Sequence, residues 1–416
     1  MTAARHLYIP VYTVTLLLSA FLLFLVQPMF GKMVLPLLGG SSSVWNTAML
    51  FFQATLLAGY AYAHGTARFM SVRAQALLHI VLLILFLFVL PITIPDGWTP
   101  PTDKDPTLWQ LLLMTVSVGG PFFVLSGSAP MLQHWFAHTK HPDSDNPYFL
   151  YAASNLGSIT ALIAYPFLVE PILNISQQSL SWAGAYCALI VLVGLSALIA
   201  WPNATRAHST IISINDDTPV TWKHRGLWLL LAFIPSSLML GVTTFITTDL
   251  ASMPLLWILP LALYVSTFII VFAKRPLISI EKTALIQGLL MVSLLSVICL
   301  LPFVNKLVII VLHLLTFFFT ALMCHHELAA SRPNPKHLTQ FYLLMSFGGA
   351  LGGFFNAIIA PNIFVVPLEY AIVLALASFM RGSIDPEKAI MVSWLKYKTM
   401  FAARKPGFLL RSGLAC

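Results

Sequence analysis

Two charged residues stand next to long apolar stretches, where a membrane helix would be expected to end. Lys32 follows an apolar run that begins at Ile9, and Asp249 follows a set of threonines. A charge at the bilayer centre costs about 3 kcal/mol on insertion scales, so such residues usually face a cavity or a partner. Two interpretations stay open. Either both residues lie in outer loops, with the Lys32 amine reaching the surface, or both helices are interrupted and Asp249 attracts an amine, with Lys32 as its resting partner.

Other polar residues inside the apolar spans are candidates for substrate contact. For Asn155 and Asn356, hydrogen bonding between helices explains the residue as well as substrate binding does. Gln27 is a further polar residue in a span, and Glu170 is interpreted as a solvated helix end. The full set of candidate substrate-binding residues is Lys32, Asn46, Gln53, Asn155, Asp249, Asn356 and Glu369.

The run His325-His326-Glu327 contains residue types that bind metals, but its spacing does not suit a metal site. Adjacent residues on a helix do not share one face, and the HExxH pattern is absent. We therefore predict no metal site. His325 and Glu327 are interpreted as a cytoplasmic motif that caps or anchors the tenth span, with a specific functional role as the alternative.

The glycine cluster GGALGG, Gly348 to Gly353, could suggest nucleotide binding. It lies within an apolar span with no strand before it, whereas a dinucleotide fingerprint follows a strand. The pairs Gly348/Gly352 and Gly349/Gly353 have the GxxxG spacing that lets helices approach closely. Helix packing is therefore predicted, with no cofactor and no catalytic residue.

The composition explains why these residues must be positioned by membrane helices. The 416 residues are 58% hydrophobic and 9% charged, whereas soluble domains carry about 25% charged residues. Since a span needs about 20 apolar residues, the sequence predicts twelve. They are 9–30, 44–63, 75–95, 108–130, 148–169, 180–201, 226–247, 254–273, 284–303, 307–325, 340–361 and 363–380.

The distribution of basic residues predicts the orientation. With the N-terminus in the cytoplasm, nineteen Lys and Arg fall on the cytoplasmic side and three on the outer side, as the positive-inside rule requires. The net charge of +8 is explained in this way, without nucleic acid. We predict a multi-pass protein of the plasma (inner) membrane with both termini cytoplasmic.

An internal repeat divides the chain. Residues 128–158 align with 320–350 at an offset of 192, which matches Ser154 with Ser346, and Trp45 matches Trp257 at an offset of 212. Six spans per half give a parallel repeat, as in major-facilitator carriers. The predicted fold is all-α, with a first half (1–201), a cytoplasmic linker (202–225), a second half (226–380) and a basic cytoplasmic tail (381–416).

Four stretches carry a resemblance to a known family. They are LVQPMFGKMVLPLLGGSSSVWNTAMLFFQATLLAGYAYAH, NPYFLYAASNLGSITALIAYPFLVEPIL, PSSLMLGVTTFITTDLASMPLLWILPLALY and CHHELAASRPNPKHLTQFYLLMSFGGALGGFFNAIIAPNIF. They resemble the membrane part of the bacterial fused major-facilitator/spermidine synthase proteins. The resemblance implies a polytopic module followed by a soluble aminopropyltransferase-like domain. Only 36 residues follow residue 380 here, so no synthase activity is expected.

Two functions remain open from the sequence. The first is a secondary carrier that works by alternating access in the lipid bilayer; the resemblance implies an amine or a polyamine-related substrate. The second is a non-transporting membrane anchor or scaffold for a separate spermidine synthase-like partner, or a truncated relative of the fused protein. A polar cavity between the halves favours transport, and a bundle filled with Leu and Phe argues against it.

Overall fold

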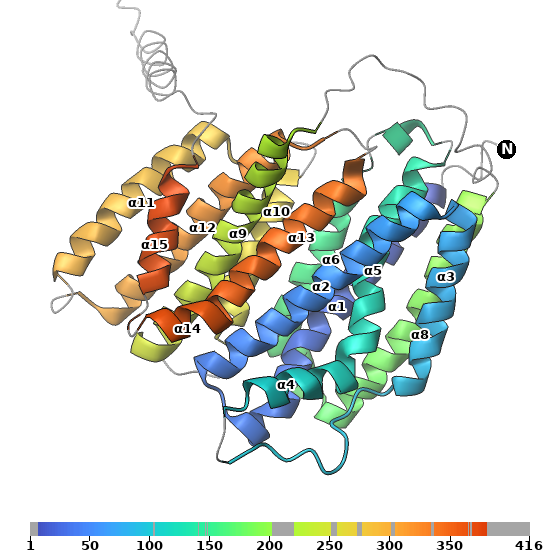
Figure 1. Cartoon of the computed structure of the whole chain (residues 1–416), viewed down its shortest axis with the longest axis horizontal. Helices are drawn as coiled ribbons and strands as arrows, with labels where there is room; N and C mark the ends of the chain where they lie inside the picture. The colour runs from blue at the N-terminus through green and yellow to red at the C-terminus, as the bar shows by residue number, and fades with distance from the viewer. Residues whose placement is uncertain are drawn as a thin grey trace, which may run out of the picture.

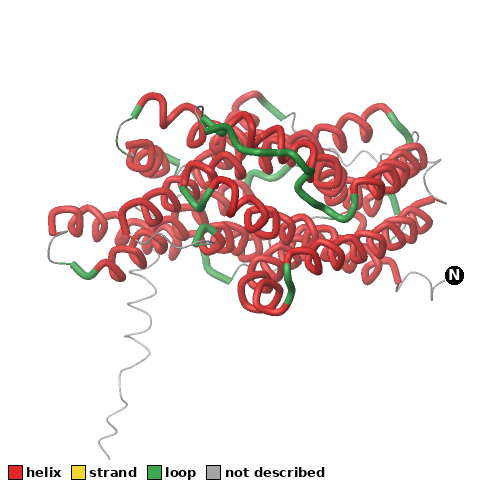
Figure 2. Tube along the Cα trace, turned by 90° about the horizontal axis from the view of Figure 1, so that it is seen from below, coloured by secondary structure: helices red, strands yellow, loops and turns green. Residues whose placement is uncertain are grey.

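The computed structural model describes most of the chain as helices joined by short loops. It describes residues 7–102, 105–139, 141–145, 147, 149–201, 220–250, 256–272, 277–300, 304–333, 337–364, 366 and 368–380. Within these ranges no strand is present, and each of the twelve predicted spans falls on a helix (Figures 1 and 2). The all-α prediction is confirmed. Most of the predicted linker and the predicted tail lie outside the described residues.

The first half contains six spans, of which three are built from more than one helical segment. The fourth contains a π-helical segment, η3, and the fifth contains another, η5. The segments are α1 (Tyr8–Leu38), α2 (Ser42–Phe69), α3 (Val72–Leu85) with η2 (Phe86–Val89), α4 (Thr107–Met114) with η3 (Thr115–Gly119) and α5 (Gly120–Ala137), α6 (Phe149–Ala164) with η5 (Tyr165–Val169) and α7 (Glu170–Ile172), and α8 (Ile175–Ala200). A short 3-10 segment, η4 (Pro142–Asp145), precedes α6.

The second half contains the matching six spans. They are α9 (Trp222–Phe245) with η7 (Ile246–Leu250), α10 (Ile258–Phe272), α11 (Ile280–Leu300), α12 (Lys306–Ala330), α13 (Leu338–Phe354) with η10 (Phe355–Ile359) and α14 (Ala360–Ile363), and α15 (Leu368–Ser378). The π segments η5 and η10 begin 190 residues apart, and each is followed by a short helix with a proline at its second position, Pro171 and Pro361.

Most of these spans are long and apolar enough to cross a membrane. In the described part of the chain nine helices meet that requirement by length and composition, and α10 and α15 are shorter apolar helices. The helix α2 is long enough at 28 residues, but it is less apolar because it contains residues such as Asn46 and Gln53. The chain is therefore a multi-pass membrane protein.

The first helix is longer than the sequence predicted. It was expected to end at Phe30, but α1 runs unbroken to Leu38. It ends at Gly39, whose φ of 75° lies in the left-handed region that favours glycine. Lys32 therefore lies inside a helix. Both the outer-loop position and the helix break that were considered for Lys32 are wrong.

The internal repeat has a direct structural counterpart in the way the first helix of each half meets the fifth. A side chain at Gly157 of α6 would collide with the Leu17 carbonyl of α1, and one at Gly348 of α13 would collide with the Leu229 carbonyl of α9. Leu17 and Leu229 are separated by the 212-residue offset of the repeat. Gly352 also lies close to the backbone of α9. The predicted packing role of Gly348 and Gly352 is confirmed.

The two halves lie side by side. In Figure 1, α3 and α8 form one flank and α11, α12 and α15 the other, while α2 and α13 run next to each other across the centre. Across the interface α2 packs on α13 and α6 packs on α10. We call the end of the bundle where α1 begins the near end, and the end where it stops the far end.

Candidate functional site

A cavity of about 140 Å³ lies between the two halves. A cavity needs about 10–15 Å³ of such space to hold one water, so this one has room for a small organic molecule. The first half contributes α1, α2, α5 and α6 to its wall, and the second half contributes α9, α10 and α13. Among the candidate residues, Gln53 and Asn155 line it, as does Gln27. None of the described residues that line it is Asp, Glu, Lys or Arg.

A chain of polar contacts joins three helices beside this cavity. Gln53 Nε2 of α2 donates to Ser236 Oγ of α9 at 2.9 Å, and Ser236 Oγ donates to the Gly349 carbonyl of α13 at 2.9 Å. Asn356 Nδ2 in η10 donates to Ser237 Oγ of α9 at 2.7 Å and to the Gly352 carbonyl at 2.9 Å. The sequence left two roles open for Asn356 and Asn155, a hydrogen bond between helices or contact with substrate. Asn356 makes a bond between helices, whereas Asn155 lies on the cavity wall.

The near end of the cavity is closed by tyrosines and hydrogen bonds between the halves. Tyr342 of α13 stacks on Tyr151 of α6 with ring centroids 5.1 Å apart, and its hydroxyl donates to Gln133 Oε1 of α5 at 2.8 Å. Closer to the helix ends, His64 Nδ1 and Thr339 Oγ1 are 2.9 Å apart. These contacts connect α2, α5 and α6 with α13.

The far end is closed mainly by two tryptophans. Trp45 of α2 and Trp257, the residue before α10, stack with ring centroids 3.3 Å apart, and both are 8% exposed. The internal repeat matches these two residues with each other. A pseudo-twofold rotation exchanges the two halves and therefore exchanges these two residues. Because they touch each other, they lie at the axis of that rotation. Beside them, Asn46 Nδ2 donates to Thr244 Oγ1 of α9 at 3.1 Å.

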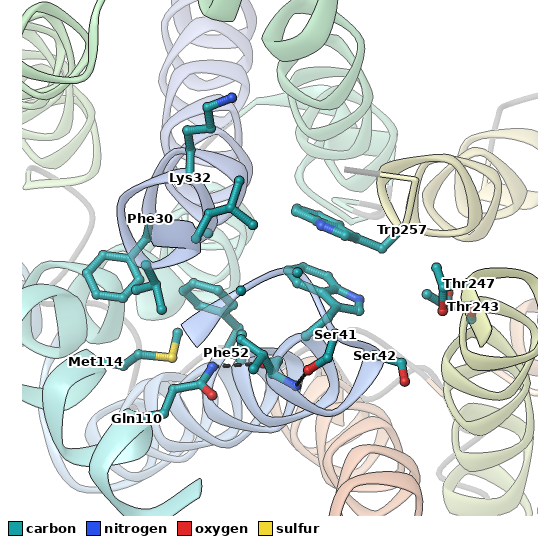
Figure 3. A pocket seen from close by; sticks show the side chains of 18 residues that line it. Phe30, Lys32, Ser41, Ser42, Phe52, Gln110, Met114, Thr243, Thr247 and Trp257 are labelled. Atoms are coloured by element: carbon teal, nitrogen blue, oxygen red, sulfur yellow. Dashed lines mark hydrogen bonds between the residues drawn. The ribbon is translucent and has the colours of Figure 1, made fainter. Parts of the chain in front are cut away.

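Lys32 lies at the edge of a smaller pocket of about 60 Å³ at the far end (Figure 3). Its amine points away from Trp257 and forms an ion pair with Glu170 at 2.5 Å. The two side chains are 37% and 26% exposed. Glu170 is therefore not simply a solvated helix end. The ion pair explains how Lys32 is tolerated inside α1.

The remaining charged candidates lie away from the central cavity or outside the described part. Asp249 belongs to η7, but its side chain is outside the described residues. Glu369 is buried in the first turn of α15 and is not among the residues that line the cavity. Their proposed contact with substrate stays a prediction.

His325 does not act as a helix cap. It is fully buried between α12 and α10, where its Nδ1 lies 2.6 Å from Thr267 Oγ1 and its ring stacks on Phe268 at 3.8 Å. Glu327, two residues later, is also buried. The capping interpretation is wrong because α12 continues to Ala330, so both side chains are still inside the bundle. The cytoplasmic position of the two residues stays a prediction. Among the described residues no group of three or more His, Cys, Asp or Glu could hold a metal ion.

The sequence did not identify the aromatic residues of the site. Tyr60, Tyr151, Tyr264 and Phe268 line the cavity, but aromatic residues in apolar spans usually pack against other helices or lipid. One signal was available. The repeat matches Ser154 with Ser346, and both residues line the cavity, one from each half.

Solved structures with the same fold are transporters of the major facilitator superfamily. The chain is similar to the xylose transporter XylE from E. coli in a partially occluded inward-open conformation, with a TM-score of 0.54, 13% identity and coverage of 91% of this chain and 98% of that one. It is similar to the human organic anion transporter MFSD10, with a TM-score of 0.54, 13% identity and coverage of 91% and 97%. A D-xylose–proton symporter matches with a TM-score of 0.55, 14% identity and coverage of 90% and 98%.

Sequence identities of 13% and 14% establish only that the fold is shared. No family model matches the chain, and no curated protein matches it. The two parallel six-helix halves of the major facilitator fold are confirmed, whereas the resemblance to the fused spermidine synthase proteins stays a prediction.

Proposed function

We propose that this chain, which has the fold of the major facilitator transporters, is a secondary carrier that moves a small molecule across the membrane by alternating access. The central cavity between the two halves carries the proposal. Contacts between the two halves lie on both sides of it, those of Tyr342 at the near end and the stack of Trp45 on Trp257 at the far end. A carrier needs closures on both sides of its site that open in turn.

The proposal includes the orientation and the division of the chain. The near end would face the cytoplasm, because nineteen of the basic residues then lie on that side, and the membrane would be the plasma (inner) membrane. The two moving units would be residues 1–201 and 226–380, connected by 202–225. A scaffold for a separate synthase-like partner would not need a cavity between the halves with polar groups in its wall, so transport is the better-supported function.

Cysteine labelling in membrane vesicles tests alternating access without knowledge of the substrate. In a variant without Cys187, Cys299, Cys324 and Cys416, a single cysteine replaces Ser154, which is buried in the cavity wall. We expect a membrane-impermeant maleimide to label this cysteine from either side of the membrane, because each end opens in turn.

Two crosslinked pairs provide matched controls for this experiment. A bifunctional crosslink between cysteines at Trp45 and Trp257 should block labelling from the far side only. A crosslink between cysteines at His64 and Thr339 should block it from the near side only. Labelling that no crosslink affects, or that is absent from both sides, would contradict alternating access.

A further inference from the structure

The two walls of the central cavity differ in chemistry. Of the eighteen lining residues from the first half, nine are polar, whereas only Tyr264 and Ser346 are polar among the nine from the second half. The second-half wall is built mainly from residues such as Met239, Leu261 and Phe268. A molecule in this cavity meets hydrogen-bonding groups on one side and an apolar surface on the other.

The orientation of two glutamines in the first-half wall is fixed by their partners. Gln27 Nε2 donates to the Leu23 carbonyl at 3.4 Å, and a carbonyl can only accept. Gln53 Nε2 donates to Ser236 Oγ, whose own proton goes to the Gly349 carbonyl. In both residues the nitrogen is therefore engaged, and Oε1 is the atom without a hydrogen-bond partner.

These two oxygens have no donor in the structure. Gln27 Oε1 and Gln53 Oε1 are buried without a hydrogen bond, and so is Ser346 Oγ on the opposite wall. Leaving a buried acceptor unpaired is unfavourable. Asn155 Nδ2, a donor on the first-half wall, is unpaired as well. None of these four atoms is exposed to the cavity, so a bound molecule that both donates and accepts hydrogen bonds reaches them when the side chains rotate toward it.

The absence of charge from the lining limits the charge of that molecule. A buried ion needs a partner of opposite charge or a set of hydrogen bonds to compensate for lost hydration. No Asp, Glu, Lys or Arg is found among the described residues of the cavity wall. A polyamine carries several charges and would find no carboxylate among these described residues. Aromatic rings can hold a single cation, so a monovalent amine is the competing ligand.

We propose that the central cavity takes an uncharged small molecule with two faces: a polar, hydrogen-bonding edge toward the first-half wall of α1, α2 and α6, and an apolar face toward α10 and α13. This inference rests on the proposed carrier function and names its substrate class. It replaces the amine or polyamine that the family resemblance implied.

The first test is the thermal unfolding of the purified full chain with defined probes. Myo-inositol and nicotinamide are neutral, choline and putrescine are cations, and citrate is an anion. A ligand that binds the folded state raises the unfolding midpoint. We expect a rise with at least one neutral probe and none with the charged probes. A rise with a charged probe alone, or no rise with either neutral probe, would overturn the inference.

The second test adds a charge to the cavity. The variant Gln27→Glu, measured at about pH 8 to favour the ionised carboxylate, should gain a stabilisation by putrescine that the wild type lacks. The matched control is Gln178→Glu. Gln178 is likewise 4% exposed, donates to a backbone carbonyl and has an unpaired Oε1, but it does not line the cavity.

Equal responses of the two glutamate variants to putrescine would also overturn the inference. If Gln27→Glu does not fold, Ser346→Asp places a carboxylate on the opposite wall and should give the same gain. The maleimide labelling that tests alternating access uses no ligand. The labelling can therefore support the carrier function even when the ligand tests contradict the proposed substrate class.

Discussion

The near and far closures of the central cavity are built differently. At the near end, Tyr342 and Thr339 of α13 make hydrogen bonds to two helices of the first half, and Tyr342 also stacks on a third. At the far end, within the described residues, the stacked pair Trp45 on Trp257 is supported by one bond between the halves, from Asn46 to Thr244. In the part of the chain that the structure describes, the near closure connects more helices, so we expect the far end to open more readily.

The difference also follows from the repeat. The tryptophans are repeat mates that meet on the pseudo-twofold axis, so each half contributes the same residue type to the far closure. The near closure is asymmetric, because Tyr342 meets Tyr151 and Gln133, neither of which is its repeat mate. Opening the far end separates the two rings and breaks the bond from Asn46 to Thr244. Opening the near end breaks the bonds of Gln133 and His64.

The largest effect is expected at Tyr342, which is 1% exposed. Tyr342→Ala removes a buried ring and its hydrogen bond to Gln133, and large aromatic truncations cost about 3–5 kcal/mol. Chemical unfolding should show this loss, and a cysteine at Ser154 should become easier to label from the near side. Tyr342→Phe keeps the ring and should lose only about 1 kcal/mol. Unchanged near-side labelling of Tyr342→Ala would contradict the proposed closure.

A smaller effect is expected at the far end. Trp45→Leu keeps apolar bulk but removes the stack on Trp257, which contributes about 0.5–1.5 kcal/mol beyond its buried area. Labelling of the Ser154 position from the far side should become faster. The double variant with Trp257→Leu should cost less than the sum of the single changes, since the stack is lost only once. Additive losses would show that the two rings do not act together.

The third prediction concerns the contact between α2 and α13, midway between the closures. Gly353→Ala places a methyl group against Gln53 Oε1, so Gln53 must move and its bond to Ser236 is lost, at about 1 kcal/mol. Gly349→Ala is the matched control, because nothing lies within 4 Å of its added methyl group. The control should be neutral or more stable, as alanine favours helices. Equal stabilities of the two variants would contradict this contact.

The smallest effect is expected at Lys32 and Glu170, which lie outside the closures. Both side chains are partly exposed, and exposed ion pairs contribute about 0.2–1 kcal/mol. A double-mutant cycle with Lys32→Met and Glu170→Gln should give a coupling energy in that range. Far-side labelling should not change. A large increase in far-side labelling would contradict this prediction and show that the ion pair belongs to the far closure.

Much of the fold could be predicted from the sequence. All twelve spans fall on helices, because an apolar run long enough to cross a bilayer must satisfy its backbone hydrogen bonds within itself. The end of α1 was misplaced because Lys32 interrupts the apolar run, and its partner Glu170 is 138 residues away along the chain. A local pattern does not contain that partner.

The candidate site was predicted only in part. Gln53 and Asn155 line the cavity, whereas Asn356 bonds to Ser237 in a neighbouring helix. The two asparagines have the same side chain and similar apolar surroundings in the sequence. What separates them is the direction in which each helix face points, and this depends on the packing of α6 and α13.

The sequence by itself determined that the chain lies in a membrane, where its spans run and that its two halves repeat, since apolar length and spacing are properties of the chain alone. The tertiary structure decided which polar groups face one another. Gln27, Gln53 and Ser346 come from three different helices, and only packing brings them to one cavity. Likewise Trp45 and Trp257 become a closure only when the halves meet on their pseudo-twofold axis.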